Sequence, residues 1–231
     1  MELVLVRHAQ PAWRAQSGLA TNDPGLTPLG HEQATKLALW MAQPQRPRVD
    51  GLFMSTARRS QQTAAILGEA LGLTAVLAPW LVEIGSPEEW EGTPEDEVVA
   101  TLNEMKARPL EDWWDGAPGG ESFRDFHARV TDGIEGFLAR FGAGRHQGDP
   151  ARLWDVPDDG PRLVLVAHAG TNSVLTSHLL GIAPQPWEWE RFATDHASVT
   201  VLRSRPIADG DIWALEYFSD VGHLAPDQVT A

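Results

Sequence analysis

The sequence contains no cysteine and no uninterrupted apolar stretch that approaches the length of a membrane span. Without cysteine, the chain has no disulfide, no thiolate nucleophile and no cysteine-ligated zinc. A helix needs about 20 consecutive, mostly apolar residues to cross a bilayer. These absences remove disulfide-stabilised, thiol-dependent and membrane-spanning proteins from consideration.

Basic residues are also scarce, with 18 Lys and Arg against 32 Asp and Glu and a formal net charge of −14. Nonspecific nucleic-acid binding and docking on anionic membranes both need a basic surface, so we expect neither partner. A small anionic substrate stays compatible with this charge, because an acidic protein can hold a local basic pocket. The first residues lead straight into an apolar run and do not look like a signal peptide, which predicts a cytoplasmic protein. The sequence leaves the oligomeric state open, a homo-oligomer included.

The chain has 231 residues, 42% of them hydrophobic, which is enough for one substantial core. Apolar periodicity and turn residues predict strands over 3–6, 51–54, 74–77, 163–167, 198–203 and 213–218, and helices over 28–41, 57–71, 95–106, 122–141 and 171–180. Strands that alternate with helices predict an α/β fold, here a three-layer sandwich with a mostly parallel central sheet. We expect a single domain over 1–231, in which 84–160 forms a mostly helical insertion or lid with a loop.

Two of the predicted strands lead into histidine. The apolar run 3–6 ends at Arg7 and His8, and the run 163–167 ends at His168. Continuous apolar runs of this kind are typical of strands buried on both faces of a sheet. In open parallel sheets, ligands bind outside the carboxyl ends of the strands. The sequence therefore predicts an active site where these two strands end.

A third basic group and a carboxylate complete the candidate site. Arg59 lies at the start of the helix 57–71, where free N–H groups favour anions, so Arg59 and Arg7 would together bind a dianion. His8 between two arginines should stay neutral at pH 7, with one ring nitrogen available as a nucleophile. Glu83 follows the third strand, and a carboxylic acid beside a bound phosphate is favoured in the protonated form that can donate to a leaving oxygen.

The order of these motifs resembles the histidine phosphatase superfamily, whose other well-known branch is the cofactor-dependent phosphoglycerate mutases. The matching motifs, in family order, are Arg7-His8-Ala9, Leu26-Thr27 with Gly30 and Gln33-Ala34, Ser55 with Arg59 and Gln62-Thr63-Ala64, Glu83 before Trp90-Glu91-Gly92, Gly120-Glu121-Ser122 with Arg129, and His168-Ala169-Gly170. The resemblance implies a phosphoglycerate mutase-like fold over most of the chain. It differs from the family pattern at Ala9 and Ala169, each of which stands where the family has glycine.

The resemblance implies a phosphatase that hydrolyses a small phosphorylated metabolite without a metal or another cofactor. His8 would attack phosphorus and become a phosphohistidine. Arg7, Arg59 and His168 would hold the phosphoryl oxygens and stabilise the transition state. Glu83 would protonate the leaving alkoxide and then help to activate water.

Three further residues are predicted to bind phosphate or substrate. Trp13 belongs to a loop that follows His8, and Ala169 directly follows His168. Arg14 occupies the position at which many relatives carry an asparagine that touches phosphate.

The sequence also leaves alternatives open. Arg58 competes with Arg59 for the role of phosphate ligand, and Glu88, Glu89 and Glu91 compete with Glu83 for that of the acid. His196 precedes a strand and is a weaker candidate for the pocket. The activity could be that of a cofactor-dependent phosphoglycerate mutase, or the protein could be a catalytically silent phospholigand-binding module. The mutase branch's tryptophan-asparagine pair is missing from 11–14, which favours a phosphatase.

Overall fold

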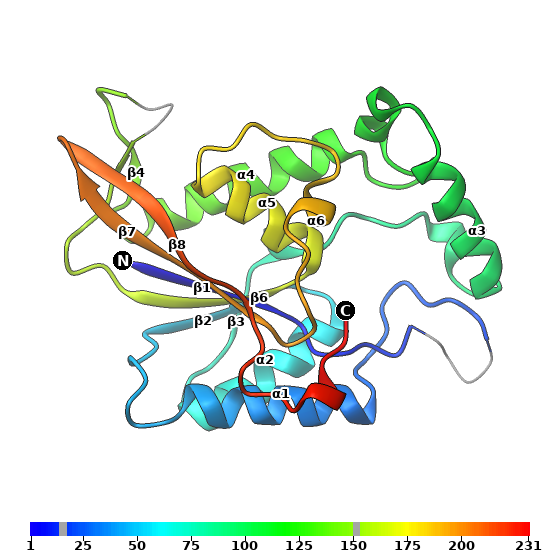
Figure 1. Cartoon of the computed structure of the whole chain (residues 1–231), viewed down its shortest axis with the longest axis horizontal. Coiled ribbons are helices and arrows are strands. Elements are labelled where there is room, and N and C mark those ends of the chain that lie inside the picture. Colours follow the sequence, from blue (N-terminus) through cyan, green and yellow to red (C-terminus); the bar gives the residue numbers. More distant parts are fainter. Residues whose placement is uncertain (14–17, 150–152) are drawn as a thin grey trace.

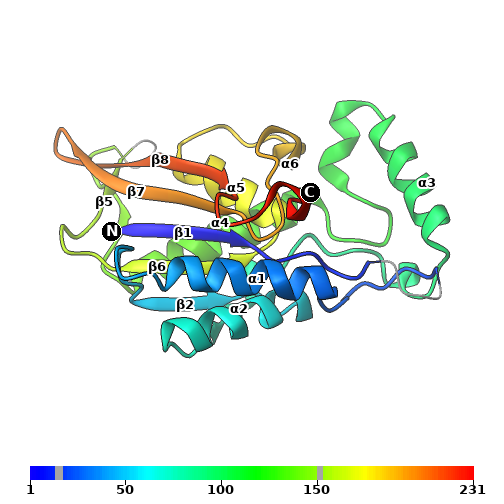
Figure 2. The ribbon, with the colours of Figure 1, turned by 60° about the horizontal axis from the view of Figure 1, so that its bottom comes forward.

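In the computed structural model, residues 1–13, 18–149 and 153–231 are described. The strands of this part of the chain form a sheet in the order β3-β2-β6-β1-β7-β8-β5-β4 (Figures 1 and 2). Their bounds are β1 Glu2–Arg7, β2 Gly51–Met54, β3 Val76–Leu77, β4 Gly144–Arg145, β5 Trp154–Asp155, β6 Arg162–Ala167, β7 Val199–Ile207 and β8 Gly210–Asp220.

Helices cover both faces of this sheet, with α1 and α2 on one face and α4 and α5 on the other (Figure 1). The helices are α1 Pro28–Met41, α2 Arg58–Leu71, α3 Glu95–Lys106, α4 Phe123–Ala139, α5 Ala169–Leu179 and α6 Glu188–Arg191, with 3₁₀ turns at Pro79–Leu81, Glu88–Trp90, Leu110–Asp115 and Pro226–Gln228. The helices predicted over 28–41 and 95–106 and the strand over 51–54 are confirmed at those bounds. None of the helices in the described ranges is both long and apolar enough to cross a membrane.

The sheet, with β1 and β6 at its centre, divides the hydrophobic core into two halves. Alternate side chains of a strand point to opposite faces of a sheet. Leu3 and Leu5 therefore pack with α4 and α5, whereas Val4 and Val6 pack with α1 and α2. Because β1 and β6 are apolar at every position inside this sandwich, both strands are buried on two sides, as their sequence predicts.

The prediction of a mostly parallel sheet is wrong. Among the described strands, β1–β6, β2–β6 and β2–β3 pair in parallel, whereas the other four pairings are antiparallel. After α5 the chain returns along β1 in the opposite direction as β7, and β8 then continues the sheet as a hairpin. The sheet is therefore mixed, with its parallel part at the strands that carry the candidate site.

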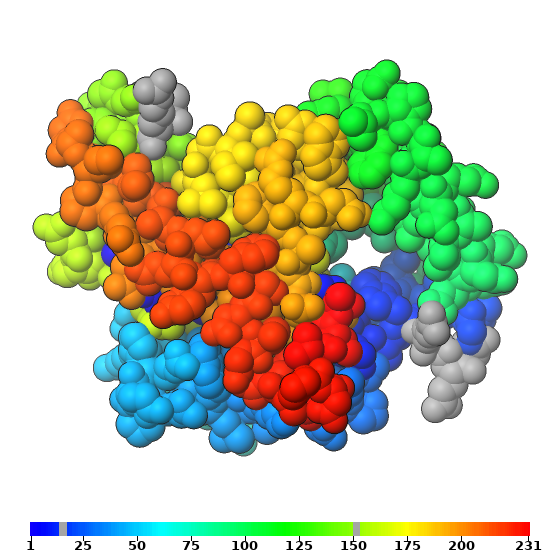
Figure 3. All heavy atoms as spheres, in the orientation of Figure 1, coloured from blue at the N-terminus to red at the C-terminus, as the bar shows by residue number. Residues whose placement is uncertain are grey.

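The segment predicted as an insertion contains two different parts. Helix α4 packs on the sheet through residues such as Phe126, Ile134 and Leu138, so it belongs to the core. None of the residues of α3, all of which the structure describes, is buried. Figure 3 shows a hollow between the green segment that carries α3 and the rest of the molecule. The short strands β4 and β5 also lie within 84–160, and the extent of one domain over 1–231 stays a prediction.

Candidate active site

The parallel strands bring the predicted site residues to one edge of the sheet. The backbone N–H of His8 donates to the carbonyl of Ala167 at 3.0 Å, and that of Ser55 donates to Val166 at 3.0 Å. The ends of β1, β2 and β6 therefore lie at the same level. A cavity of about 340 Å³ opens beside them, lined among others by Arg7, His8, Trp13, Arg59, Glu83 and Ala169.

The hydrogen bonds of His8 show which ring nitrogen carries the proton and which carries the lone pair. A guanidinium only donates hydrogen bonds, so the contact from Arg59 Nε to His8 Nε2 at 3.2 Å makes Nε2 an acceptor. The proton of the neutral ring then lies on Nδ1, which donates to the carbonyl of Ala9 at 2.8 Å. Nε2 thus carries a lone pair on the arginine side of the ring, which is the geometry of a nucleophile rather than of a proton donor.

Burial and positive neighbours keep this ring neutral. The side chain of His8 is buried, and burial, followed by the fields of His168 and Arg59 and a smaller one from Arg7, holds its pKa well below the usual 6.5. A histidine with such a lowered pKa stays a free base across the neutral range. The predicted neutral state of His8 therefore agrees with its surroundings.

Arg59 comes from the first turn of α2. It is buried and lines the cavity. Its guanidinium lies 4.8 Å from the centre of the Trp13 ring, and Nη1 lies 3.8 Å from Oδ1 of the exposed Asp23. Burial lowers the pKa of Arg59, and the carboxylates of Glu83 and Asp23 act against that shift. Arg58, the alternative, is exposed and does not line the cavity.

Arg7 is oriented by Thr194, which is not among the residues predicted from the sequence, and by His196, which the sequence predicts only as a weaker candidate for the pocket. Its Nη1 donates to the carbonyl of Thr194, and its Nη2 donates to Nε2 of His196 at 3.0 Å. His196 Nδ1 in turn donates to the hydroxyl of Thr230 at 3.0 Å, near the end of the chain. Burial, together with the charge of Arg7, lowers the pKa of His196 to about 3, so this histidine is a neutral acceptor.

His168 lies beside His8 but does not itself line the cavity. The two ring centres are 5.1 Å apart, and Nε2 of His168 forms a hydrogen bond with Ser55 Oγ at 2.8 Å. Its Nδ1 is buried without a hydrogen-bond partner among the described residues. Burial and the charges of Arg59 and Arg7 hold the pKa of His168 well below 6.5. Contact with phosphoryl oxygens, which the resemblance implies, stays a prediction.

Glu83 faces the start of α5. Its Oε2 accepts a hydrogen bond from Gly170 N at 2.9 Å, and its Oε1 accepts one from Ile84 N at 3.1 Å. A Cβ at position 170 would lie 2.5 Å from Oε1, so this approach needs glycine. Helix α5 begins at Ala169, two residues before the predicted start, which is why its free N–H groups reach the carboxylate. Of the described residues that line the cavity, Glu83 is the one glutamate.

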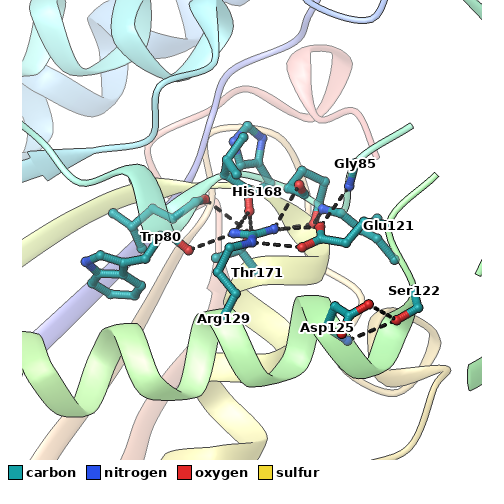
Figure 4. A network of polar contacts seen from close by, with 12 residues as sticks. Trp80, Gly85, Glu121, Ser122, Asp125, Arg129, His168 and Thr171 are labelled. Atoms are coloured by element: carbon teal, nitrogen blue, oxygen red, sulfur yellow. Dashed lines mark hydrogen bonds and ion pairs between the residues drawn. The ribbon is translucent and has the colours of Figure 1, made fainter. Parts of the chain in front are cut away.

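A partly buried ion pair holds the segment that carries Glu83. Arg129 of α4 donates Nε and Nη2 to the two carboxylate oxygens of Glu121 at 2.9 and 2.7 Å, and Nη1 to the carbonyls of Trp80 and Val82 at 3.0 Å each (Figure 4). Glu121 also accepts a hydrogen bond from Gly85 N at 3.0 Å. The backbone before Glu83, at Val82, and after it, at Gly85, is therefore held by the same bidentate ion pair.

The two alanines that stand in place of family glycines differ in position. Ala9 is fully buried, belongs to the half-core formed with α1 and α2, and does not line the cavity, whereas Ala169 does. Trp13 lines the cavity, and its role in binding substrate stays a prediction; Arg14 lies outside the described residues.

A neutral imidazole that lies beside guanidiniums and shares a cavity with a carboxylate, at the strand ends of an α/β sandwich, is suited to the transfer of phosphoryl groups. The chain belongs to the histidine phosphatase superfamily (branch 1), whose family model matches residues 3–209. The sequence-based identification of the family is therefore confirmed.

Relatives and solved structures of this family include both mutases and phosphatases. A curated relative, a probable phosphoglycerate mutase GpmB of Yersinia enterocolitica, is 27% identical, with 97% of this chain and 95% of the relative covered. The structure of a mycobacterial glucosyl-3-phosphoglycerate phosphatase has a TM-score of 0.68 and 26% identity, covering 94% of this chain and 98% of that one. The alpha-ribazole phosphatase of Shigella flexneri shares the fold, with a TM-score of 0.71 at 22% identity and coverage of 96% and 97%.

Proposed function

We propose that this protein is a metal-independent phosphatase that hydrolyses a phosphomonoester through a phosphohistidine on His8. The observation that carries the proposal is that His8 Nε2 is unprotonated and directs its lone pair, as a hydrogen-bond acceptor, at Arg59 Nε beside the cavity. A phosphoryl group that displaces this hydrogen bond would meet a nucleophile in His8 and a ligand for its oxygens in Arg59. Arg7 and Arg59 supply positive charge that other phosphatases take from metal ions.

In the first step, the Nε2 lone pair forms a bond to phosphorus while the ester P–O bond breaks. Arg7 and Arg59 stabilise the charge that develops on the three phosphoryl oxygens. The carboxyl group of Glu83 gives its proton to the departing oxygen, so an alcohol leaves rather than an alkoxide.

In the second step, water forms a bond to phosphorus, the N–P bond breaks, and inorganic phosphate leaves. Glu83, now a carboxylate, takes a proton from that water and so returns to its starting form. His8 recovers the neutral state in which Nδ1 donates to Ala9.

The mycobacterial phosphatase supports this proposal, because two of its structures are complexes, one with VO3 and one with inorganic phosphate. A second candidate function is phosphoryl transfer of the mutase type, which the probable phosphoglycerate mutases among the curated relatives favour. Both reactions use a phosphorylated histidine, and they differ in whether water or a second substrate accepts the phosphoryl group.

Hydrolysis of p-nitrophenyl phosphate by the purified protein tests the proposal. We expect turnover that persists in EDTA and that His8→Ala abolishes, with circular dichroism unchanged. Unchanged activity of His8→Ala would contradict the proposal. The absence of any turnover, together with tight binding of inorganic phosphate, would instead support a silent phospholigand-binding protein.

A coupled mutase assay separates the two catalytic candidates. With 3-phosphoglycerate as substrate, with and without bisphosphoglycerate, we expect no appreciable formation of the 2-isomer. A rate of isomer formation that exceeds the rate of phosphate release would favour the mutase.

A further inference from the structure

A second cavity of about 440 Å³ opens directly from the catalytic one. The two cavities share the lining residues Trp13, Asn22, Ile84, Gly85 and Ser86. A molecule whose phosphoryl group lies between His8 and Arg59 therefore has a continuous path into this second space. We call the second cavity the leaving-group pocket.

One wall of the leaving-group pocket is a helix face that belongs to neither hydrophobic core cluster of the described residues. Val98, Val99, Leu102 and Met105 of α3 line the pocket at helical spacing. The side chains of Val99 and Leu102 are 46% and 40% exposed. Amphipathic helices normally bury such an apolar stripe, and exposed apolar patches of this kind usually mark a binding surface. Here the stripe lines the pocket, and the segment that carries it borders the hollow seen in Figure 3.

The opposite walls are aromatic. Trp90, Trp113 and Trp189 line the pocket, and Trp13 stands where the two cavities meet. Indole rings give large, rigid contact areas for apolar and aromatic groups. Trp13 also lies against the guanidinium of Arg59, so one ring contacts both the phosphate ligand and the path into the pocket.

The charged residues at this pocket do not favour a second anionic group on the substrate. Lys106 lies 3.0 Å from the carboxylate of Glu190, and Arg108 donates Nη2 to the carbonyl of Gly116 at 2.9 Å. Glu95 and Glu121 are acidic members of the lining. Among the described lining residues, an additional carboxylate on the substrate would meet a lysine already paired with Glu190 and an arginine already bonded to a backbone carbonyl, together with the carboxylates of Glu95 and Glu121.

From these observations we infer that the leaving group of the substrate is a bulky, apolar alcohol, aliphatic or aromatic, rather than a small hydroxy acid. The phosphoryl group would bind at His8 and the apolar group would lie between α3 and the tryptophans. This inference rests on the proposed phosphatase function and deepens it by naming the class of substrate.

A series of n-alkyl phosphates from ethyl to octyl tests the inference, because the acidity of the leaving alcohol hardly changes along the series. Each methylene that enters an apolar pocket should raise kcat/KM by up to about fourfold. We expect hexyl phosphate to exceed ethyl phosphate by at least about tenfold and 3-phosphoglycerate to be a poorer substrate than hexyl phosphate.

A matched pair of variants places the effect in the pocket. Leu102→Asp puts a charge on the apolar face of α3 and should lower the ratio of kcat/KM for hexyl over ethyl phosphate by at least about tenfold. Leu39 is 65% exposed on α1 and does not line the pocket, so Leu39→Asp should leave that ratio unchanged. Inhibition by hexylphosphonate against methylphosphonate should follow the same pattern as a measure of binding alone.

Failure of the inference and failure of the proposed function give different results. If p-nitrophenyl phosphate is hydrolysed but kcat/KM is flat along the alkyl series, or 3-phosphoglycerate is the best substrate, the inference is wrong and the phosphatase stands. If no phosphomonoester is hydrolysed, the proposed function fails first. Light scattering gives a further check, since a dimer that Leu102→Asp dissociates would mean that a second copy covers the α3 face, which would overturn the inference.

Discussion

The catalytic cavity and the leaving-group pocket adjoin each other but are built in opposite ways. His8, Arg7 and Arg59 lie at strand ends and a helix start, are largely buried, and contact fixed backbone or side-chain groups. The apolar wall of the leaving-group pocket belongs to α3, whose described residues are all at least partly exposed. The sheet thus holds the catalytic side chains in fixed positions. The apolar face of α3 lies outside the core, so its residues can differ without moving those side chains. Four predictions test this division, from the largest expected effect to the smallest.

The largest effect is expected at Arg59. Arg59→Ala removes the guanidinium that faces His8 Nε2 and should lower kcat/KM for p-nitrophenyl phosphate about 10³-fold. Arg58→Ala is the control in the same helical turn, and its exposed charge should matter by less than about threefold because solvent ions screen it. Both values of kcat/KM are measured by steady-state kinetics. Equal losses in Arg59→Ala and Arg58→Ala would contradict the assignment of Arg59 as the phosphate ligand.

The next effect concerns the proton donor. Glu83→Gln keeps the size of the side chain but has no proton to give, so kcat/KM for hexyl phosphate should fall about 10²- to 10³-fold. The loss should be much smaller with p-nitrophenyl phosphate, whose leaving group needs little protonation. A loss of the same size for both substrates would argue against an acid role.

Glu121 lies where the two regions meet, since it lines the leaving-group pocket and holds Arg129. Glu121→Gln weakens the bidentate pair that ties the backbone around Glu83, so kcat should fall about tenfold, with a smaller change in KM. Because Glu121 acts through Glu83, the loss should be greater for alkyl than for p-nitrophenyl phosphate. A uniform loss for all substrates, with a lowered melting temperature, would indicate a purely structural role.

The smallest effect is a pH dependence of stability. His196 has a pKa of about 3 in the folded protein, whereas an unfolded histidine titrates near pH 6.5. Between these values the unfolded state binds the extra proton, so the free energy of unfolding falls as the pH falls, by up to about 1.4 kcal/mol per pH unit from this residue. His196→Gln should show a correspondingly shallower slope in urea titrations between pH 6.5 and 4.5. An unchanged slope would show that His196 is not held neutral.

Much of the rigid region could be predicted from local sequence, because its parts are marked locally. Apolar runs that end in Arg7-His8 and His168 identify the strand ends, and helical periodicity followed by Gly72 at the C-cap identifies the helix that presents Arg59. The contact of His196 with Arg7 could not be predicted in this way. It arises because β7 runs antiparallel to β1, and local periodicity does not encode the direction of pairing.

The leaving-group pocket shows the other limit of sequence reasoning. The spacing of Val98, Leu102 and Met105 predicts the helix correctly, but it does not tell whether the apolar face packs on a core. Only the position of α3 away from the sheet shows that this face lines a cavity. The early start of α5, which brings Gly170 to Glu83, was likewise within the usual uncertainty of helix ends.

The central claim is that His8 Nε2 carries the phosphoryl group during turnover. Rapid acid-free quenching of the protein with a phosphate-labelled phosphomonoester, followed by phosphorus NMR and peptide mapping, tests it most directly. We expect an acid-labile, base-stable phosphohistidine on Nε2 of His8 that forms and decays at rates compatible with kcat. Turnover without a labelled protein, or a label that persists in His8→Ala, would contradict the account.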